Sequence, residues 1–176
     1  MNKHELKQNL NFHHSRFTEY LGSLPSERLN LPLESKWSPL QQLDHIIKSI
    51  SPVTMAFSQP AFLLRIIFGA ANRPSRSYEV LIEKYQSKLA AGGKAPPRFV
   101  PAPVSSSLNE LSGRLTKKVN LLSEKIDSFS EEQLDKLILP HPLLGKLTLR
   151  EMLYFSIYHV QHHHKQVTIF ITQHPN

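Results

Sequence analysis

The sequence predicts an all-α protein, a four-helix bundle with additional short helices and proline-rich loops. Apolar residues recur at helical spacing in several long segments, and Ser, Thr, Pro and Gly residues mark the ends of those segments. The 176 residues are 40% hydrophobic and 20% charged, which is typical of a globular chain, and the length fits one domain over 1–176. No segment with strand periodicity has a useful length.

The first predicted helix runs from about Lys3 to Leu21, where Gly22 and Pro25 indicate its end. Its apolar face carries Leu6, Leu10, His13 or His14, Phe17 and Leu21. A short helix opening at Ser26 and Glu27 then leads to Pro32.

The second long helix is predicted from the run Lys36-Trp37-Ser38-Pro39. Ser38 is a good N-cap, and Pro39 suits the first helical position because its missing N–H would be unpaired there. The apolar stripe of this helix is formed by Leu40, Leu43, Ile46, Ile47 and Ile50. It should end near Pro52 or a little beyond, and His45 lies at the border of the stripe.

The middle of the chain predicts shorter helices and a long loop. An apolar segment from Pro60 through Ile67 is broken by 69–74, and 75–90 is a further helix candidate that ends at Gly92-Gly93. The loop from Gly92 to Pro103 contains four prolines and should be irregular and exposed. It is a lid, a dimer contact or a plain connector.

Two further long helices complete the predicted bundle. The first follows the serines of 105–107, with the stripe Leu108, Leu111, Leu115, Val119, Leu122 and Ile126. A tight loop is expected over 141–145, marked by Pro140, Pro142 and Gly145. The last helix begins after Thr148, which forms a capping box with Glu151, and runs to about Thr172.

Composition restricts the function. The absence of cysteine excludes disulfides, thiolate metal sites and a cysteine nucleophile. The 21 basic residues give a formal charge of +7 but are scattered, so we expect a solvated basic surface and no specific nucleic-acid binding. The first ten residues lack the apolar core of a secretory peptide, and 61–71 is too short to span a membrane. We therefore expect a cytoplasmic protein without membrane association.

The ten histidines include one informative cluster, His159 to His164. His159 and His163 are four residues apart, so both imidazoles leave the same face of a helix and can meet one ion. His162 and His164 point about 100° to either side of His163 and cannot join that pair. Unpaired imidazoles in a core are costly, which favours a shared metal ion or hydrogen-bond partners.

His45 is the candidate third ligand. Taken alone, it is equally well a core histidine bonded to a main-chain carbonyl, but helical bundles commonly build metal sites from facing helices. One histidine of the second long helix and two of the last would form a site with open positions for water or substrate.

These residues resemble the DinB-like (YfiT-like) superfamily of bacterial proteins. The resemblance rests on Trp37-Ser38-Pro39, on His45-Ile46, on His159 and His163 with His162 and Gln166 beside them, and on the run His141-Pro-Leu-Leu-Gly-Lys-Leu-Thr-Leu. It spans nearly the whole chain.

The resemblance implies a four-helix bundle in which His45, His159 and His163 bind a divalent metal ion, often nickel or zinc. Members of this superfamily include thiol-dependent transferases and proteins assigned as metal-dependent hydrolases, and they tend to form homodimers. The apolar segment from Phe62 to Phe68 is a candidate contact surface.

Three functions are compatible with these features. The first is an enzyme, a metal-dependent hydrolase or a transferase acting on a small-molecule substrate with a thiol cosubstrate. The second is a noncatalytic metal-binding or stress-response protein, and the third is a helical interaction module without metal. No convincing general base is visible, since Glu151 is used in capping and Asp44 points away from His45. His141 is either a neighbour of the site or a surface residue before proline.

Overall fold

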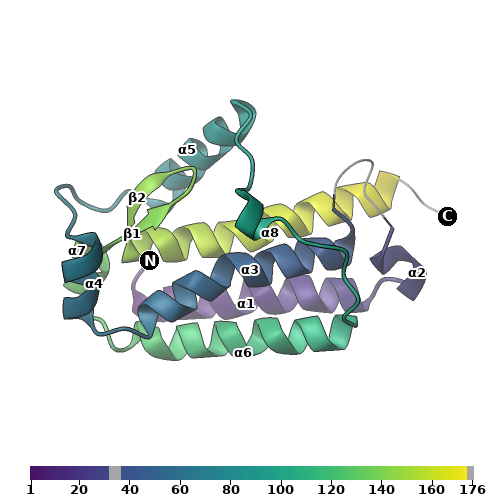
Figure 1. Ribbon diagram of the computed structural model, residues 1–176, viewed down its shortest axis with the longest axis horizontal. Coiled ribbons are helices and arrows are strands. Elements are labelled where there is room, and N and C mark those ends of the chain that lie inside the picture. The colour runs from purple at the N-terminus through teal and green to yellow at the C-terminus, as the bar shows by residue number, and fades with distance from the viewer. Residues whose placement is uncertain (32–36, 174–176) are drawn as a thin grey trace.

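Four long helices lie side by side along the long axis of the molecule (Figure 1). They are α1 (Lys3–Gly22), α3 (Pro39–Phe57), α6 (Leu108–Ile126) and α8 (Leu149–Gln173). In this computed structural model, which describes residues 1–31 and 37–173, α1 and α3 each pack against both α6 and α8. The predicted four-helix bundle is confirmed.

Shorter elements connect the long helices. They are α2 (Ser26–Leu29), α4 (Ala61–Phe68), α5 (Tyr78–Ala90), the 3₁₀ helix η1 (Pro97–Phe99) and α7 (Glu131–Lys136). The sequence reasoning did not predict α7, although Ser130 and Gln133 form a capping box at its start. The predicted limit Pro32 and the first residue of the Lys36-Trp37-Ser38-Pro39 run lie outside the described residues.

Helices α3 and α8, which carry the candidate histidines, begin at the N-caps that the sequence predicts. The Ser38 hydroxyl accepts a hydrogen bond from the main-chain N–H of Gln41, and the Gln41 side chain accepts one from the N–H of Ser38. Thr148 and Glu151 form the equivalent pair at the start of α8. These two caps fix the registers of the helices that carry His45, His159 and His163.

Helix α3 was expected to end near Pro52 or a little beyond, and it runs past the proline to Phe57. The last turn is held in place by packing, because Val53 and Phe57 are buried in the core. Burial of these side chains outweighs the single helical hydrogen bond that the proline removes.

A two-stranded antiparallel hairpin precedes α8, where only a tight loop was expected. Its strands are β1 (Ile138–His141) and β2 (Gly145–Thr148), with Ile138 paired to Thr148 and His141 paired to Gly145. Gly145 has a φ of 76°, a left-handed conformation that glycine adopts at low cost. Strands of four residues are too short to show a periodicity of two in the sequence.

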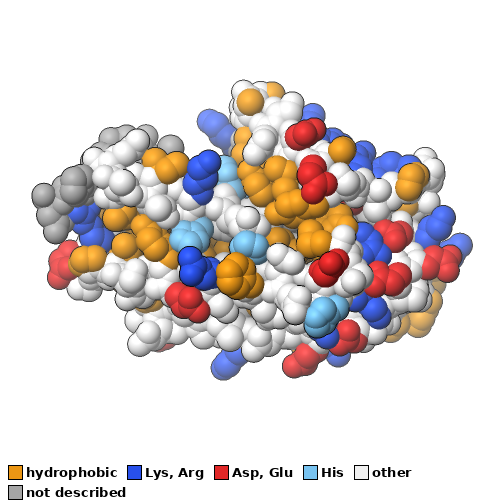
Figure 2. Space-filling model, turned by 180° about the vertical axis from the view of Figure 1, so that it is seen from behind, with side chains coloured by type: hydrophobic (Ala, Val, Ile, Leu, Met, Phe, Trp, Pro, Cys, Tyr) orange, Lys and Arg blue, Asp and Glu red, His pale blue; other side chains and the backbone are white. Residues whose placement is uncertain are grey.

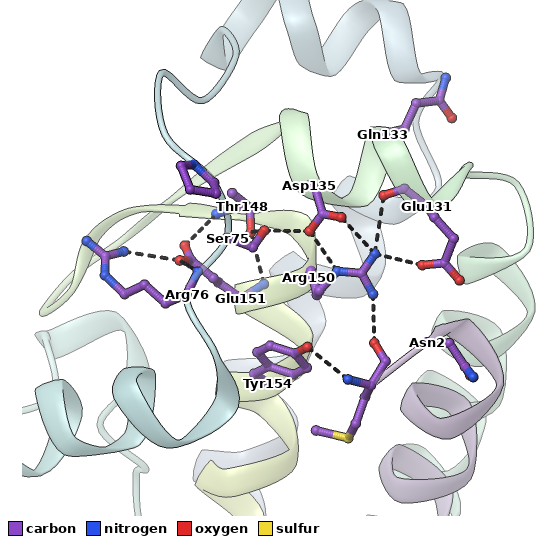
Figure 3. Close-up of polar contacts among 12 residues, drawn as sticks. Asn2, Ser75, Arg76, Glu131, Gln133, Asp135, Thr148, Arg150, Glu151 and Tyr154 are labelled. Atoms are coloured by element: carbon purple, nitrogen blue, oxygen red, sulfur yellow. Dashed lines mark hydrogen bonds and ion pairs between the residues drawn. The ribbon is translucent and has the colours of Figure 1, made fainter.

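A polar network anchors the start of α8 (Figure 3). Glu151 is fully buried and accepts hydrogen bonds from the Arg73 guanidinium at 2.6 and 2.7 Å and from the main-chain N–H of Arg76 at 2.8 Å. Arg150 pairs with Glu131 at 2.6 Å and with Asp135 at 2.7 Å. The network ties α7 and the segment before α5 to α8.

Helix α5 begins at Tyr78 instead of the predicted Ser75 because of the same network. The Ser75 hydroxyl donates to Asp135 at 2.6 Å, and the main-chain N–H of Arg76 is already bonded to Glu151. These bonds hold the two residues outside the helix, and Ser77 caps it instead.

The surface carries mixed charge, and α4 exposes apolar side chains. Basic side chains are interspersed with acidic ones on the face drawn in Figure 2. On α4, the side chains of Phe62, Ile66 and Ile67 are 67%, 75% and 58% exposed. Among the described residues, no single helix has the length and apolarity to cross a membrane, while α3 and α4 meet these criteria only as a pair bent by 111°.

Candidate metal centre

Three histidines from two facing helices meet between α3 and α8. Nε2 of His159 lies 3.2 Å from Nε2 of His45 and 3.0 Å from Nε2 of His163. The candidate ligand atoms of the three residues all lie within 4.8 Å of one another, and the three side chains are buried. The structure therefore brings together the three residues that were predicted as ligands.

In two of these histidines, the hydrogen bond of Nδ1 fixes which ring nitrogen carries the proton. Nδ1 of His45 donates to the main-chain oxygen of Phe99 at 2.7 Å, and Nδ1 of His163 donates to Oε1 of Gln42. The orientation of the Gln42 amide follows from its nitrogen, which donates to the main-chain oxygen of Trp37. A neutral imidazole with a proton on Nδ1 has a free lone pair on Nε2. Both lone pairs therefore face the centre of the cluster.

The number of protons available to the three Nε2 atoms is too small to hydrogen-bond both close pairs, which favours a bound cation between them. His159 can supply at most one Nε2 proton, and two Nε2 lone pairs face that same atom at hydrogen-bond distance. One proton cannot make two linear hydrogen bonds, so at least one close nitrogen pair lacks a proton. Two nitrogens that bind one zinc ion at about 2.0–2.1 Å each lie about 3.3 Å apart. The donor set and its spacing fit a divalent metal ion.

Electrostatics keep the three imidazoles neutral, the form that binds metal. Burial lowers the pKa of His159 and of His163 well below the ordinary value, and the neighbouring histidines lower both further. Burial also lowers the pKa of His45, although the hydrogen bond to Phe99 opposes that shift. At neutral pH the Nε2 atoms of His45 and His163 therefore carry no proton that a metal ion would have to displace.

Aromatic rings fix the orientation of the cluster. The Trp37 ring lies 4.6 Å from the His45 ring, and the Phe155 ring stacks on His159 at 4.7 Å between centroids. Trp37 belongs to the run that predicted the start of α3, so this run both begins the helix and packs against its histidine.

The remaining histidines of the predicted cluster point elsewhere. His164 packs against Phe17 and Tyr20 of α1. His162 is bonded to Gln166 at 2.9 Å and lines the cavity next to the three histidines without joining them. Asp44 is not a member of the three-histidine group and pairs with Lys48.

A cavity of about 830 Å³ opens onto the three histidines. Its wall is mainly apolar and includes Met55, Leu63, Ile67, Leu139, Met152 and Phe155. The predicted irregular loop closes one side of it, since Phe99 and Lys94 also line the cavity. Lys48 donates to the main-chain oxygen of Val100 at 3.1 Å, which holds this loop on α3. The volume is within the range of small-molecule sites.

Sequence reasoning missed the two hydrogen-bond acceptors that orient His45 and His163. Gln42 lies three residues before His45 on α3, so its position on the same helical face was readable in the sequence. The acceptor from Phe99 is a main-chain oxygen, which has no signature in the sequence.

A four-helix bundle with three buried histidines on two facing helices defines a class of protein with a candidate metal centre in its core. The family model of the DinB superfamily matches residues 9–167, and the chain therefore belongs to this superfamily. The match includes all three histidines of the centre.

Two solved structures share this fold. The first is YfiT from Bacillus subtilis, described as a probable metal-dependent hydrolase with an unusual four-helix bundle topology. It has a TM-score of 0.66 and 15% identity over 97% of this chain and 86% of that one. The second is the four-helix bundle protein TT2238, with a TM-score of 0.59 and 18% identity over 96% of this chain and 99% of that one. The search of curated proteins found no match.

Proposed function

We propose that the protein binds a divalent metal ion, nickel or zinc, through His45, His159 and His163 and acts as a metal-dependent hydrolase. The observation that carries this proposal is the pair of Nε2 lone pairs that face Nε2 of His159 inside an open cavity. The description of YfiT as a probable metal-dependent hydrolase supports the same reaction class.

Different residues of the chain would have different roles in such a site. The three histidines hold the ion, and a divalent ion supplies Lewis acidity toward a carbonyl oxygen or a water molecule. Gln42 and the main-chain oxygen of Phe99 keep two of the imidazoles in the metal-binding tautomer. The apolar wall excludes bulk water and binds the apolar part of a substrate.

Transfer of a small-molecule thiol is a second candidate reaction. The chain has no cysteine, so the thiol would enter as a cosubstrate. The cavity of about 830 Å³ favours this alternative, because it has room for two small reactants beside the histidines.

Metal binding is tested by elemental analysis after loading with Ni²⁺ or Zn²⁺. We expect one ion per chain in the wild type and its loss in His159→Ala and His163→Ala, with the helical content retained. His164→Ala is the matched control, because His164 is on the same helix but packs against α1. Full occupancy in His163→Ala, or no ion in the reloaded wild type, would contradict the proposal.

The reaction class is tested on the loaded protein with p-nitrophenyl esters of increasing acyl length and, separately, with small thiols and an electrophilic acceptor. Metal-dependent ester cleavage supports the hydrolase, and metal-dependent consumption of thiol supports the transferase. If neither assay responds while chelation lowers the unfolding temperature sharply, the ion has a structural role.

A further inference from the structure

His141, the last residue of β1, is held by hydrogen bonds to the turn between β1 and β2. Its Nδ1 accepts the main-chain N–H of Leu143 at 3.2 Å and that of Leu144 at 3.1 Å. Both donors are main-chain amides, so Nδ1 must be an acceptor in both contacts. The ring therefore cannot carry its proton on Nδ1 without losing two hydrogen bonds.

This arrangement selects one tautomer of the neutral ring. With the Nδ1 lone pair occupied, the proton is on Nε2. Burial lowers the pKa of His141 to about 4, so the ring is neutral at physiological pH. In this state His141 can donate a hydrogen bond from Nε2 but has no free lone pair with which to act as a base.

The ring lies beside the candidate metal centre. Its centroid is 4.2 Å from that of Phe155, whose ring also stacks on His159. His141 lines the same cavity as the three histidines. Among the described residues, none is bonded to its Nε2, while Nδ1 faces the turn.

The cavity offers donors and cations but no carboxylate. Of the described residues that line it, Lys94 and Arg98 are charged, and none is Asp or Glu. A ligand that satisfies the Nε2–H of His141 must therefore bring its own acceptor atom. The mainly apolar wall requires the rest of that ligand to be apolar.

We propose that His141 is a substrate-binding residue whose Nε2–H donates to a carbonyl or carboxylate oxygen of an apolar substrate. This proposal rests on the proposed function, because it places the substrate in the cavity onto which the three histidines open. It assigns the chemical class of the substrate, an apolar acyl compound.

Two substitutions distinguish the role of His141 as a ligand donor at Nε2 from its role as an acceptor for the turn at Nδ1. In His141→Asn the side-chain oxygen can still accept the N–H groups of the turn, since asparagine is favoured in this role, but no donor is left at the Nε2 position. In His141→Gln a donor amide reaches the Nε2 position while the acceptor at the Nδ1 position is lost. His141→Asn should keep the fold and weaken binding of the acyl ligand. His141→Gln should recover part of that affinity.

The first measurement is the tautomer of His141 from ¹⁵N chemical shifts and ring couplings in metal-free protein. We expect a proton on Nε2 and none on Nδ1. The opposite tautomer, or a ring that exchanges freely between both, would overturn the proposal whether or not the protein binds metal.

The second measurement is the binding of hexanoate by calorimetry, in metal-free and in zinc-loaded protein. We expect His141→Asn to bind hexanoate about 10-fold to 100-fold more weakly than the wild type, and His141→Gln to lie between the two. Equal affinity of His141→Asn and wild type, or no binding of hexanoate to the wild type, overturns the proposal. Zinc content is measured in parallel, so failure of the metal site is recognised separately.

Discussion

Gln42 accepts a hydrogen bond from Nδ1 of His163, and the pairing joins α3 to α8 beside the three Nε2 atoms. The contact orients the ring and places its proton away from the candidate metal. Replacing Gln42 with leucine leaves a buried N–H without an acceptor and allows the other tautomer. We expect Gln42→Leu to weaken Zn²⁺ binding about 10-fold to 100-fold, as measured by competition with a chromophoric chelator.

The control for this effect is Gln8→Leu, which makes the same chemical change at an exposed position of α1. It should bind Zn²⁺ as the wild type does. If Gln42→Leu also keeps wild-type affinity, the Gln42 contact has no role in orienting His163.

Glu151 is expected to contribute to stability through its charge. It is fully buried and accepts bonds from Arg73 and Arg76, whose side chains are 31% and 26% exposed. In Glu151→Gln the capping box remains available, because glutamine also serves at that position, but the ion pairs are lost. We expect a loss of about 1–3 kcal/mol in the free energy of unfolding, measured with urea.

Glu131→Gln is the matched comparison, because Glu131 is 47% exposed and Arg150 keeps Asp135 as a partner. Its effect should stay below about 1 kcal/mol. Equal losses in the free energy of unfolding would show that burial does not strengthen the ion pairs of Glu151 relative to those of Glu131.

The sequence was sufficient for those parts of the site that depend on local spacing. His159 and His163 are on one helix, so their separation of four residues already placed them on one face. His45 is 114 residues from His159, and the contact between them depends on how α3 packs on α8. Helical periodicity does not encode that packing, and His45 was identified mainly by the family resemblance.

Apart from the Gln42 contact, the features that sequence reasoning missed are short elements or involve main-chain atoms. The hairpin strands have four residues each, and α7 has six, so neither develops a clear period. The acceptor for His45 is the main-chain oxygen of Phe99, which any residue could supply. The local sequence also does not give how far α3 extends beyond Pro52, because the last turn depends on tertiary burial of Phe57, which outweighs the local effect of proline.

The expected homodimer leads to a prediction about α4. Ile66 is 75% exposed next to the exposed residues Phe62 and Ile67, and large exposed apolar patches mark protein–protein contacts. If a second copy of the chain covers this face, Ile66→Glu should convert a dimer into a monomer in sedimentation velocity. Leu121→Glu, on the exposed side of α6, should leave the dimer intact. A wild type that sediments as a monomer at all concentrations tested would refute this assignment.

His14 should make the stability of the bundle depend on pH. It is buried on α1 with Nδ1 bonded to the main-chain oxygen of Leu10, and burial lowers its pKa to about 4. Between pH 6.5 and about 4 the unfolded chain binds a proton at this residue and the folded chain does not. The contribution of His14 to the free energy of unfolding is therefore complete above pH 6.5 and decreases as the pH falls. Near pH 4 the loss is about 3 kcal/mol.

The variant His14→Leu removes this titration and keeps an apolar side chain in the core. Urea unfolding of metal-free protein between pH 7.5 and 4.5 should give a flatter dependence for His14→Leu than for the wild type. His4→Leu, an exposed position on the same helix, should follow the wild-type curve. Parallel curves for His14→Leu and the wild type would show that His14 is protonated equally in the folded and unfolded chains.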